Sequence, residues 1–297
     1  MKISEILSRP GVTLSCEIFP PKQALQLEET ARVARDIAQL KPAFISVTYG
    51  AAGNVPRFTC EVAQEVQRAG VPALSHLTCI NDTKDKIGGV LADFAASGVE
   101  NVLALRGDLP AGADFPGEDH FTHASDLTAA IKRAGDFCVG GACYPEGHPE
   151  SPSIDADLDA LRRKVDAGAD FLTTQMFFDN NVMYNFLYRA LRKGIRVPIL
   201  AGVMPVCRAA QMKRIVALSG ASLPAGFRAI LDRFGDQPEA MRQAGVAFAT
   251  QQIVDLVANG VDHIHLYTMN RPEIAREILR NLSGVLAAGE EPAHGSL

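Results

Sequence analysis

Short apolar runs alternate with amphipathic stretches along almost the whole chain. The apolar runs are rich in β-branched residues and predict strands, whereas apolar residues spaced three to four apart predict helices. The predicted strands cover 12–19, 43–49, 72–79, 101–106, 136–144, 170–178, 197–204 and 262–268. The predicted helices cover 26–39, 57–69, 84–97, 125–134, 156–168, 182–193 and 208–219. Glycines fall at five joins where a helix should end before the next strand, at Gly70, Gly98, Gly168, Gly194 and Gly260.

Strands that alternate with helices indicate a parallel sheet, and eight of them suit a closed barrel. We therefore predict a single-domain (β/α)8 TIM barrel over residues 1–287, with a frayed C-terminal tail over 288–297. An open doubly wound sheet is the alternative. The long span 205–261 between the last two strands requires two or three helices.

Side-chain alternation within the strands predicts which residues face the barrel interior. In the first strand Glu17 should point inward and the neighbouring apolar residues outward. The expected inward set is Thr13, Ser15, Glu17, Phe19, Ser46, Thr48, His76, Thr78, Ala104, Arg106, Thr173, Gln175, Phe177, His263, His265 and Tyr267, with Leu103 and Leu105 facing outward. A purely structural core has no reason to collect Glu, His, Arg and Gln, so this pattern indicates an active site at the carboxyl ends of the strands.

Composition narrows the class of protein further. The chain has 297 residues, 47% of them hydrophobic, with a mean hydropathy of +0.05. Its net charge of −5 argues against a nucleic-acid partner. No apolar run is long enough to cross a bilayer, and the N-terminus does not resemble a signal peptide. The six scattered cysteines are expected to be reduced thiols, so we expect a cytoplasmic protein.

Common catalytic motifs are weak or missing. His76-x-x-Cys79 would face opposite sides of its strand, and no acidic residue flanks His263 and His265 at strand spacing, so no metal site is predicted. Neither a nucleophile elbow nor a nucleotide-binding glycine motif is present, so any dinucleotide must be held by the barrel loops.

Two charged features have both a structural and a functional interpretation. Glu17 lies next to Phe19 and two prolines, where partial desolvation favours the protonated form that a general acid requires. The alternative is a structural ion pair, with Arg106 as the candidate partner. The basic run 162–164 is either a solvated helix face or a phosphate clamp at the barrel rim.

Nine motifs in order then resemble one family, the flavoprotein methylenetetrahydrofolate reductases. The matching segments are 16–22 (CEIFPPK), 46–51 (SVTYGA), 75–79 (SHLTC), 105–108 (LRGD), 124–127 (ASDL), 142–150 (ACYPEGHPE), 163–169 (RKVDAGA), 174–179 (TQMFFD) and 267–271 (YTMNR). They span about residues 10 to 285 and resemble the short form of the family, which has only the catalytic domain.

The resemblance implies an activity and its cofactors. It implies FAD at the carboxyl end of the barrel, reduced by NADH or NADPH, which leaves before 5,10-methylenetetrahydrofolate enters the same face. The product would be 5-methyltetrahydrofolate, which links one-carbon metabolism to methionine biosynthesis. It implies that the partners are small molecules only, and it does not decide whether the protein forms a homo-oligomer.

The resemblance also implies roles for individual residues. Glu17 resembles the general acid that opens the five-membered ring to an iminium, and Asp108 resembles the carboxylate that tunes the flavin and contacts the pterin. Flavin contacts are implied for Thr48, Tyr49, Ala51, His76, Arg106, Gly107, Asp108, His123, Ala124, Ala142, Tyr144, His148, Asp157, Arg163 and Lys164. Substrate contacts are implied for Glu17, Asp108, Gln175, Gln211, Tyr267 and Arg271.

Two positions depart from the family pattern. His123 stands where a tyrosine is common, which would alter one flavin contact. The segment 207–215 (CRAAQMKRI) has no Phe or Tyr, although some relatives carry an aromatic gate over the flavin there. The preference between NADH and NADPH therefore stays open.

Two other function classes remain. One is a folate-binding barrel methyltransferase that needs no flavin. The other is a non-catalytic barrel with a binding role, against which the inward polar set argues. The colour of the purified protein would separate both from a flavoprotein.

Overall fold

The strands close into a barrel in which every neighbouring pair is parallel. The computed structural model describes residues 1–49, 56–109 and 117–288. The strands are β1 (Thr13–Ile18), β2 (Ile45–Val47), β3 (Ala73–Thr78), β4 (Asn101–Leu105), β5 (Cys138–Cys143), β6 (Phe171–Thr174), β7 (Ile199–Val203) and β8 (His263–Tyr267). Each strand pairs with the next along the chain, and β8 pairs with β1. The predicted (β/α)8 barrel is thus confirmed, and the open sheet is excluded.

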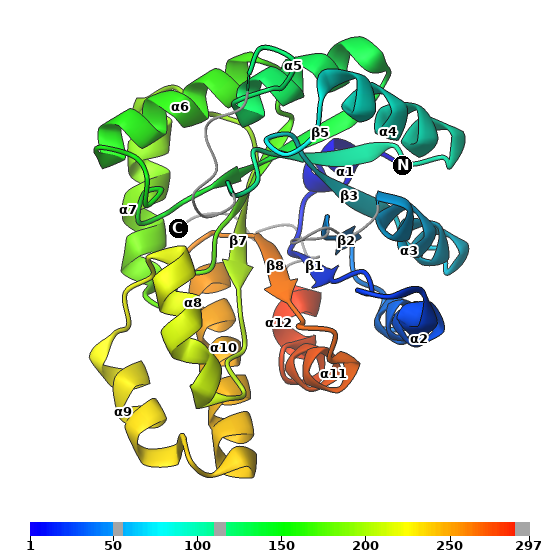
Figure 1. Cartoon of the computed structure of the whole chain (residues 1–297). Coiled ribbons are helices and arrows are strands. Elements are labelled where there is room, and N and C mark those ends of the chain that lie inside the picture. The colour runs from blue at the N-terminus through cyan, green and yellow to red at the C-terminus, as the bar shows by residue number, and fades with distance from the viewer. Residues whose placement is uncertain (50–55, 110–116, 289–297) are drawn as a thin grey trace.

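Helices surround the barrel and connect successive strands (Figure 1). They are α1 (Ile3–Leu7), α2 (Leu27–Ala38), α3 (Pro56–Arg68), α4 (Lys84–Ala96), α5 (Ala124–Ala134), α6 (Ile154–Asp166), α7 (Asn180–Arg192), α8 (Met212–Ser219), α9 (Ala225–Phe234), α10 (Pro238–Ala258), α11 (Pro272–Asn281) and α12 (Ser283–Ala288), with short 3-10 turns at Ala24–Gln26 and Ala209–Gln211. The span 205–261 holds α8, α9 and α10, as predicted. The five expected helix-ending glycines all have positive φ, from +70° to +112°.

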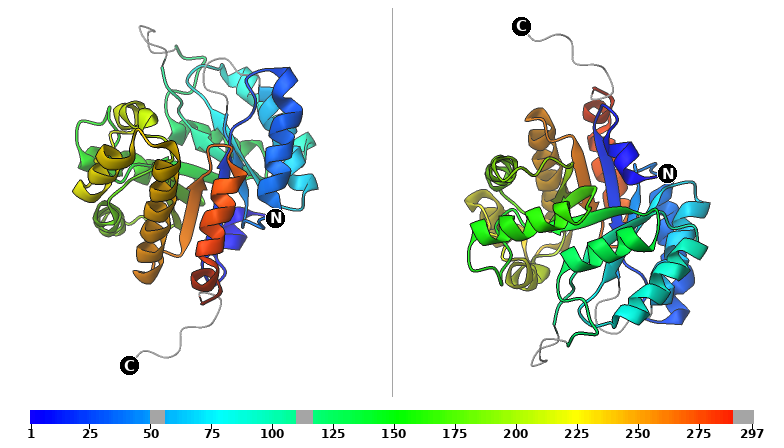
Figure 2. Two further views of the ribbon diagram at one scale, coloured as in Figure 1. Left: turned by 90° about the horizontal axis from the view of Figure 1, so that it is seen from below. Right: turned by 90° about the horizontal axis from the view of Figure 1, so that it is seen from above.

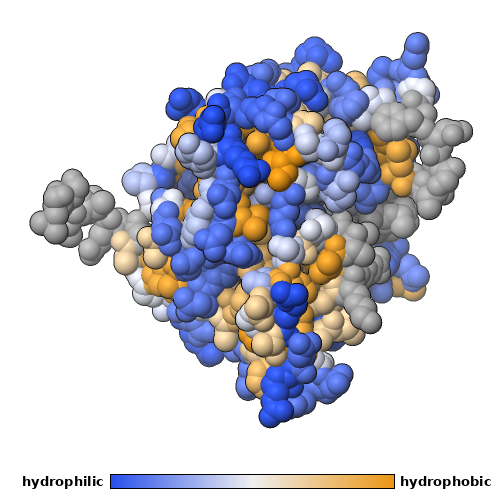
Figure 3. Space-filling model, turned by 90° about the vertical axis from the view of Figure 1, so that its left-hand side faces the viewer, coloured by the Kyte–Doolittle hydropathy of each residue, from blue (hydrophilic) through white to orange (hydrophobic). Residues whose placement is uncertain are grey.

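The outer core lies between the strands and the helices. It contains the outward residues of β1 and β8, such as Leu14, Cys16 and Leu266, together with apolar residues of the surrounding helices. A smaller cluster at the mouth packs α8 and α9 against α10 through Met212, Phe227 and Met241. The side of the molecule that carries α6 to α9 is mainly hydrophilic, with hydrophobic patches between the hydrophilic areas (Figure 3).

The barrel interior is apolar toward the amino ends of the strands, and α1 closes this end. Ile3, Ile6 and Leu7 pack against inward residues of the strands, among them Phe44 and Phe171. The backbone N–H of Ile3 donates to the side-chain oxygen of Asn101 at 2.8 Å, which ties α1 to β4. In Figure 2, α1 and α12 lie at the same end of the barrel. The sequence pattern did not predict α1, because five residues are too few for a helical period.

Two side-chain assignments from the sequence were wrong. Leu103 and Leu105 belong to the interior cluster, whereas Ala104 lies in the outer core, so the facing predicted for the fourth strand was inverted. The register agrees, since Leu103 stands beside the inward-facing His76. Phe177 also lies in the outer core, because β6 ends at Thr174 and the alternation stops there. The barrel interior near its amino end is apolar and accommodates leucine. Apolar character alone therefore does not distinguish inward from outward residues.

Gly245 allows α10 to approach the connection that follows β7. A Cβ atom at Gly245 would lie 2.0 Å from the carbonyl oxygen of Val206. The segment after Val206 leads to Gln211 at the barrel mouth, so this close approach also positions one rim of the site.

We expect Gly245→Ala to lower the free energy of unfolding by about 1–3 kcal/mol, because backbone atoms cannot yield as a flexible side chain does. Gly88→Ala in α4 is the matched control: its Cβ would meet nothing within 4 Å, and alanine should stabilise the helix by about 0.5–1 kcal/mol. Urea denaturation of both variants measures the two effects. Equal stabilisation would show that the contact at Val206 is unimportant.

Candidate functional site

Glu17 lies inside the barrel near the carboxyl end of β1, and it is only 8% exposed. Its Oε2 atom is 3.7 Å from Nε2 of His76 and 3.9 Å from Nε2 of His265. Arg106, the partner considered from the sequence, binds Glu150 instead. The carboxyl group therefore faces two imidazole rings rather than a permanent cation.

The ends of β1 and β8 are fastened to each other around Glu17. The hydroxyl of Thr268 donates to the backbone carbonyl of Glu17 at 2.6 Å. The side chain of Asn270 accepts from the N–H of Phe19 at 2.7 Å and donates to its carbonyl at 3.0 Å. These bonds hold the backbone on both sides of the carboxyl group, so its position is set by two strands.

The two histidines differ in their hydrogen bonds. His265 is bound at both ring nitrogens, with the hydroxyl of Ser15 2.7 Å from Nδ1 and that of Ser46 3.1 Å from Nε2. Nε2 of His76 is buried and has no hydrogen-bond partner. Burial lowers the pKa of His76 to about 4, because the imidazolium cannot be solvated there. His76 is therefore neutral at physiological pH.

Tyr267 extends from β8 across β7 to β6. Its hydroxyl donates to the carbonyl of Thr174 at 2.6 Å, and its ring meets the ring of His265 edge-on at 5.4 Å. A Cβ atom at Gly202 would lie 2.7 Å from the Tyr267 ring, so only glycine leaves room for this ring on β7. Burial raises the pKa of Tyr267 well above its usual value, and the phenol stays protonated.

Arg106 and Glu150 form a two-pronged ion pair at the mouth. The guanidinium Nη1 and Nη2 atoms donate to the two carboxylate oxygens at 2.6 and 2.9 Å. Gly107 follows with a φ of +84°, and a Cβ atom there would lie 3.0 Å from Cβ of Thr78. Asp108 is exposed beside them, and its backbone carbonyl accepts from the side chain of Asn81.

Lys164 leaves the surface of α6 and points toward β5. Its ammonium group donates to the carbonyl of Ala142 at 2.7 Å. Burial lowers the pKa of Lys164, while the nearby Cys143 and Asp157 act in the opposite direction. Burial raises the pKa of Asp157, and Lys164 partly offsets this. Arg163, in contrast, is exposed, so the basic run 162–164 is not one continuous solvated face.

Tyr144 and His148 lie over the same mouth. Their rings meet edge-on with centroids 4.6 Å apart. Burial raises the pKa of Tyr144 to about 12 and lowers that of His148. Nδ1 of His148 accepts from the N–H of Glu150 at 3.1 Å, which connects this pair to the Arg106 ion pair.

The remaining residues implied as flavin contacts lie at the same end. Thr48 follows β2, and the hydroxyl of Tyr49 donates to Asp82 at 3.1 Å, with burial raising the pKa of Tyr49. His123 caps α5, its backbone N–H donating to Asp126 at 3.2 Å, and the buried Ala124 starts the helix. Ala51 lies outside the described residues.

The residues implied as substrate contacts are spread around the rim. The N–H of Gln175 donates to the carbonyl of Cys143 at 2.7 Å. Gln211 is exposed at the end of the 3-10 turn before α8. Arg271 precedes α11, and its Nε atom donates to Glu273 at 2.9 Å. The three residues come from connections after β6, β7 and β8, which meet at one end of the barrel.

Several residues that shape this site were not singled out from the sequence. Ser15 and Ser46 were expected to face inward, but their role as partners of His265 follows only from the three-dimensional register. Glu150 stood within the motif 142–150 and was overlooked, although a charged pair with Arg106 could have been sought there. The carbonyl of Thr174 gives no sequence pattern at all.

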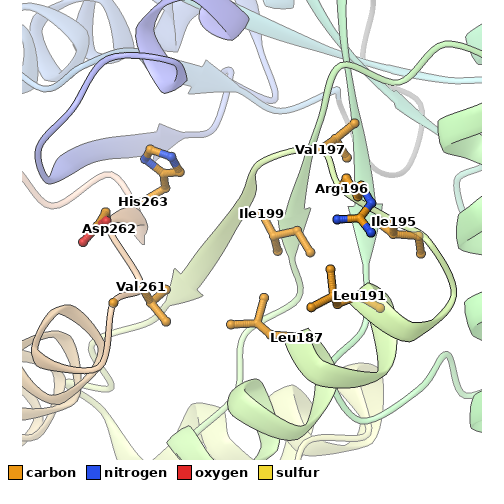
Figure 4. A pocket seen from close by; sticks show the side chains of 11 residues that line it. Leu187, Leu191, Ile195, Arg196, Val197, Ile199, Val261, Asp262 and His263 are labelled. Carbon is orange, nitrogen blue, oxygen red and sulfur yellow. The ribbon is translucent and has the colours of Figure 1, made fainter.

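Cavities lie at both ends of the barrel in the described part of the chain. One of about 310 Å³ lies at the amino end, between α7 and the starts of β7 and β8, where Leu187, Leu191 and Ile199 face Val261 and His263 (Figure 4). The other, of about 730 Å³, lies near the mouth, between Lys84 at the start of α4 and Phe121. The first is lined by apolar side chains together with Arg196, Asp262 and His263, and it lies at the opposite end from the polar site.

His263 and His265 on β8 are bound by hydroxyl groups, with Thr13 2.9 Å from Nδ1 of His263 and Ser15 2.7 Å from Nδ1 of His265. All six cysteines are free and five are buried. Within the described residues no cluster of three potential metal ligands occurs, and no helix there is both long and apolar enough to span a bilayer.

Fold and site together define an enzyme of the (β/α)8-barrel class, with its polar groups collected at the carboxyl ends of the strands. A family model for methylenetetrahydrofolate reductase matches residues 2–283. The chain belongs to the methylenetetrahydrofolate reductase family.

Individual relatives agree with this assignment. The chain is 37% identical over 273 residues to the 5,10-methylenetetrahydrofolate reductase of Escherichia coli (strain K12), covering 91% of this chain and 90% of that protein. It is 35% identical over 295 residues to methylenetetrahydrofolate reductase (NADH) 1 of Arabidopsis thaliana, covering 95% of this chain and 50% of the plant protein. An uncharacterized protein from Clostridium thermocellum that binds two copies of 5-methyl-5,6,7,8-tetrahydrofolic acid has a similar fold, with a TM-score of 0.66 at 15% identity, covering 97% of this chain and all of that protein.

The buried, neutral His76 makes the stability of the fold depend on pH. Its pKa is about 4 in the folded chain and 6.5 ordinarily, so the unfolded chain binds more protons between these values. The free energy of unfolding therefore has its full value, as far as His76 is concerned, above about pH 6.5. It decreases as the pH falls toward about 4, by up to about 1.4 kcal/mol per pH unit. Urea unfolding at several pH values should show that His76→Gln loses less free energy of unfolding between pH 6.5 and 4 than wild type does. If both proteins lose the same amount, the lowered pKa of His76 is contradicted.

Proposed function

We propose that this protein reduces 5,10-methylenetetrahydrofolate to 5-methyltetrahydrofolate with NADH or NADPH as electron donor and FAD as cofactor. The observation that carries the proposal is the buried carboxyl group of Glu17 at the mouth of the barrel, in a chain of this family. A carboxyl group in that setting can deliver a proton to a substrate that has displaced water from the mouth. The product would supply methyl groups for methionine biosynthesis.

The chemistry of the rim fits a dinucleotide cofactor. Arg106 lies close enough to Lys164 to contribute to the lowering of the Lys164 pKa, although burial is the main cause. Two cations held together favour a doubly charged anion such as a diphosphate. Gly107, with a φ of +84° that favours glycine, turns the backbone between Arg106 and Asp108 at this rim. These features support FAD at this end of the barrel.

We assign the diphosphate to Arg106, Arg163 and Lys164, and the ADP half also to Asp157. The flavin side would be held by Thr48, Tyr49, Ala51, His76, Gly107, Asp108, His123, Ala124, Ala142, Tyr144 and His148. When bound, FAD supplies the hydride-transfer chemistry between the nicotinamide and the folate. The protein's part is to bind and orient both substrates and to exclude water.

On the substrate side, Glu17 acts as the general acid and Asp108 contacts the pterin. Gln175 and Gln211 offer amide groups from two different loops. The hydroxyl of Tyr267 is already bound to Thr174, so Tyr267 would contact substrate through its ring. Arg271 is suited to the carboxylates of the folate tail, in exchange for its present partner Glu273.

A single open end of the barrel favours ping-pong kinetics. Because α1 closes the amino end, both substrates must reach the site from the carboxyl end. The nicotinamide cofactor would leave before the folate enters, and no separate nicotinamide domain is needed. We propose cytoplasmic action on small molecules, without a nucleic-acid or membrane partner.

The direct test is the absorption spectrum of the purified protein. We expect flavin bands that bleach under anaerobic conditions when NADH or NADPH is added and return when 5,10-methylenetetrahydrofolate follows. A protein that stays colourless after incubation with FAD would exclude this function and favour a folate-binding methyltransferase.

Glu17→Gln should separate the two half-reactions. Reduction of the flavin by the nicotinamide cofactor needs no acid and should stay within a few-fold of wild type. Transfer to the folate should slow by about 10²–10⁴, the usual effect of losing a general acid. Stopped-flow measurement of each half-reaction checks this. An equal loss in both would indicate that Glu17 is structural.

Lys164→Met should weaken FAD binding while keeping the alkyl stem that packs beside β5. Loss of a charge-assisted contact of ~1.5–3 kcal/mol corresponds to a dissociation constant raised about 10- to 150-fold. Titration of FAD into the apoprotein measures this, and excess FAD should restore activity. Arg192→Met, an exposed cation on α7 that stacks on Tyr188, is the control and should bind FAD normally. Identical constants for all three proteins would remove Lys164 from the site.

A further inference from the structure

The two histidines beside Glu17 lie at nearly the same distance from its carboxyl group. Nε2 of His76 is 3.7 Å from Oε2, and Nε2 of His265 is 3.9 Å from the same atom. Neither distance is a hydrogen bond, yet both rings are buried beside the carboxyl group. Distance alone therefore does not show which histidine serves Glu17.

The hydrogen bonds of the two rings distinguish them. The nitrogens of His265 already have Ser15 and Ser46 as partners, and its ring also stacks on Phe44 at 5.8 Å. His265 is thus fixed in place by the strands around it. Nε2 of His76 has no partner, although the side chain is only 5% exposed. An unpaired buried ring nitrogen costs free energy unless a ligand-bound or catalytic state provides its partner.

We propose that His76 is a positioning residue for Glu17, with its Nε2–H donating to Oε2 of the carboxyl group when substrate closes the mouth. The inference rests on the proposed function of Glu17 as general acid. A tightening of about 0.7 Å would bring the two atoms to ordinary hydrogen-bond distance, and catalytic hydrogen bonds are often longer before substrate binds. The resemblance assigns His76 only to the flavin.

The bond would direct the proton as well as hold the side chain. With Oε2 accepting from His76, the transferable proton resides on the other carboxyl oxygen, toward the substrate. That oxygen gives its proton to a ring nitrogen of the folate, whose lone pair forms the new N–H bond, and Glu17 is left as carboxylate. The N–H of His76 then stabilises the new negative charge, so the proton is released more readily.

The surroundings support a neutral donor. The low pKa of His76, about 4, keeps the ring uncharged wherever the enzyme is active, so it supplies one N–H and no net charge. Among the described residues, the titratable groups that face Glu17 are His76 from β3 and His265 and Tyr267 from β8. Tyr267 stays protonated, and its hydroxyl is committed to Thr174.

The test compares His76→Gln with His76→Met in flavin-saturated protein. Glutamine can place an N–H donor close to the position of Nε2, whereas methionine fills similar space without one. In His76→Met, the pH at which the folate half-reaction loses half of its rate should rise by about one to two units, because the carboxylate has lost a donor. The maximal rate should fall, and His76→Gln should return toward wild type.

A second measurement does not depend on turnover. The infrared C=O band of a protonated carboxyl group that disappears in Glu17→Gln identifies Glu17. In His76→Met this band should persist to higher pH than in wild type, and in His76→Gln it should not. An unmoved band and an unmoved rate profile in His76→Met would overturn the proposal, as would equal shifts in both variants.

The controls keep this inference separate from the proposed function. A wild-type protein with no folate half-reaction would refute the function, whereas a normal wild type with an unshifted His76→Met would refute only the role of His76. His263→Gln, at the amino end of β8 and bound to Thr13, should leave the pH profile in place. If His76→Met does not fold, His76→Asn replaces it with the same expectation, because its shorter amide cannot reach Oε2.

Discussion

The burial of one carboxyl group between two imidazole rings is the constraint on which the rest of the site depends. Glu17 has exchanged water for His76 and His265, and within the described part of the chain no arginine or lysine forms an ion pair with it. Such a group persists only where the surrounding strands hold it. The serines around His265, the phenol of Tyr267 and the amide of Asn270 all contribute to that fixation.

The two cations at the rim, unlike Glu17, have protein groups that compensate their charge. Arg106 and Lys164 are each compensated by protein groups, Arg106 by Glu150 and Lys164 by the carbonyl of Ala142 and by Asp157. An incoming anion must therefore replace or join these partners instead of meeting bare cations. The floor of the barrel needs no such compensation, because it is filled by residues such as Phe44 and Phe171.

Most of the fold followed from local patterns, and the failures have physical causes. Alternation placed Glu17, His265 and Tyr267 correctly, because β1 and β8 are polar inside and apolar outside. It inverted β4, where Leu103 belongs to an apolar interior. The resemblance brought together residues such as Tyr144 and His148. The hydrogen bond of the Tyr267 hydroxyl to Thr174 and the unpaired nitrogen of His76 depend on contacts between distant strands, which no local pattern encodes.

The hydroxyl of Ser15 on the first strand meets Nδ1 of His265 on the last, 250 positions later in the chain. During synthesis, β1 must wait for nearly the whole chain before its second neighbour exists, with one edge unpaired until then. The bonds that close the barrel also assemble the surroundings of Glu17. A nascent or truncated chain thus has no partly working site, and activity arises only when the last strand docks.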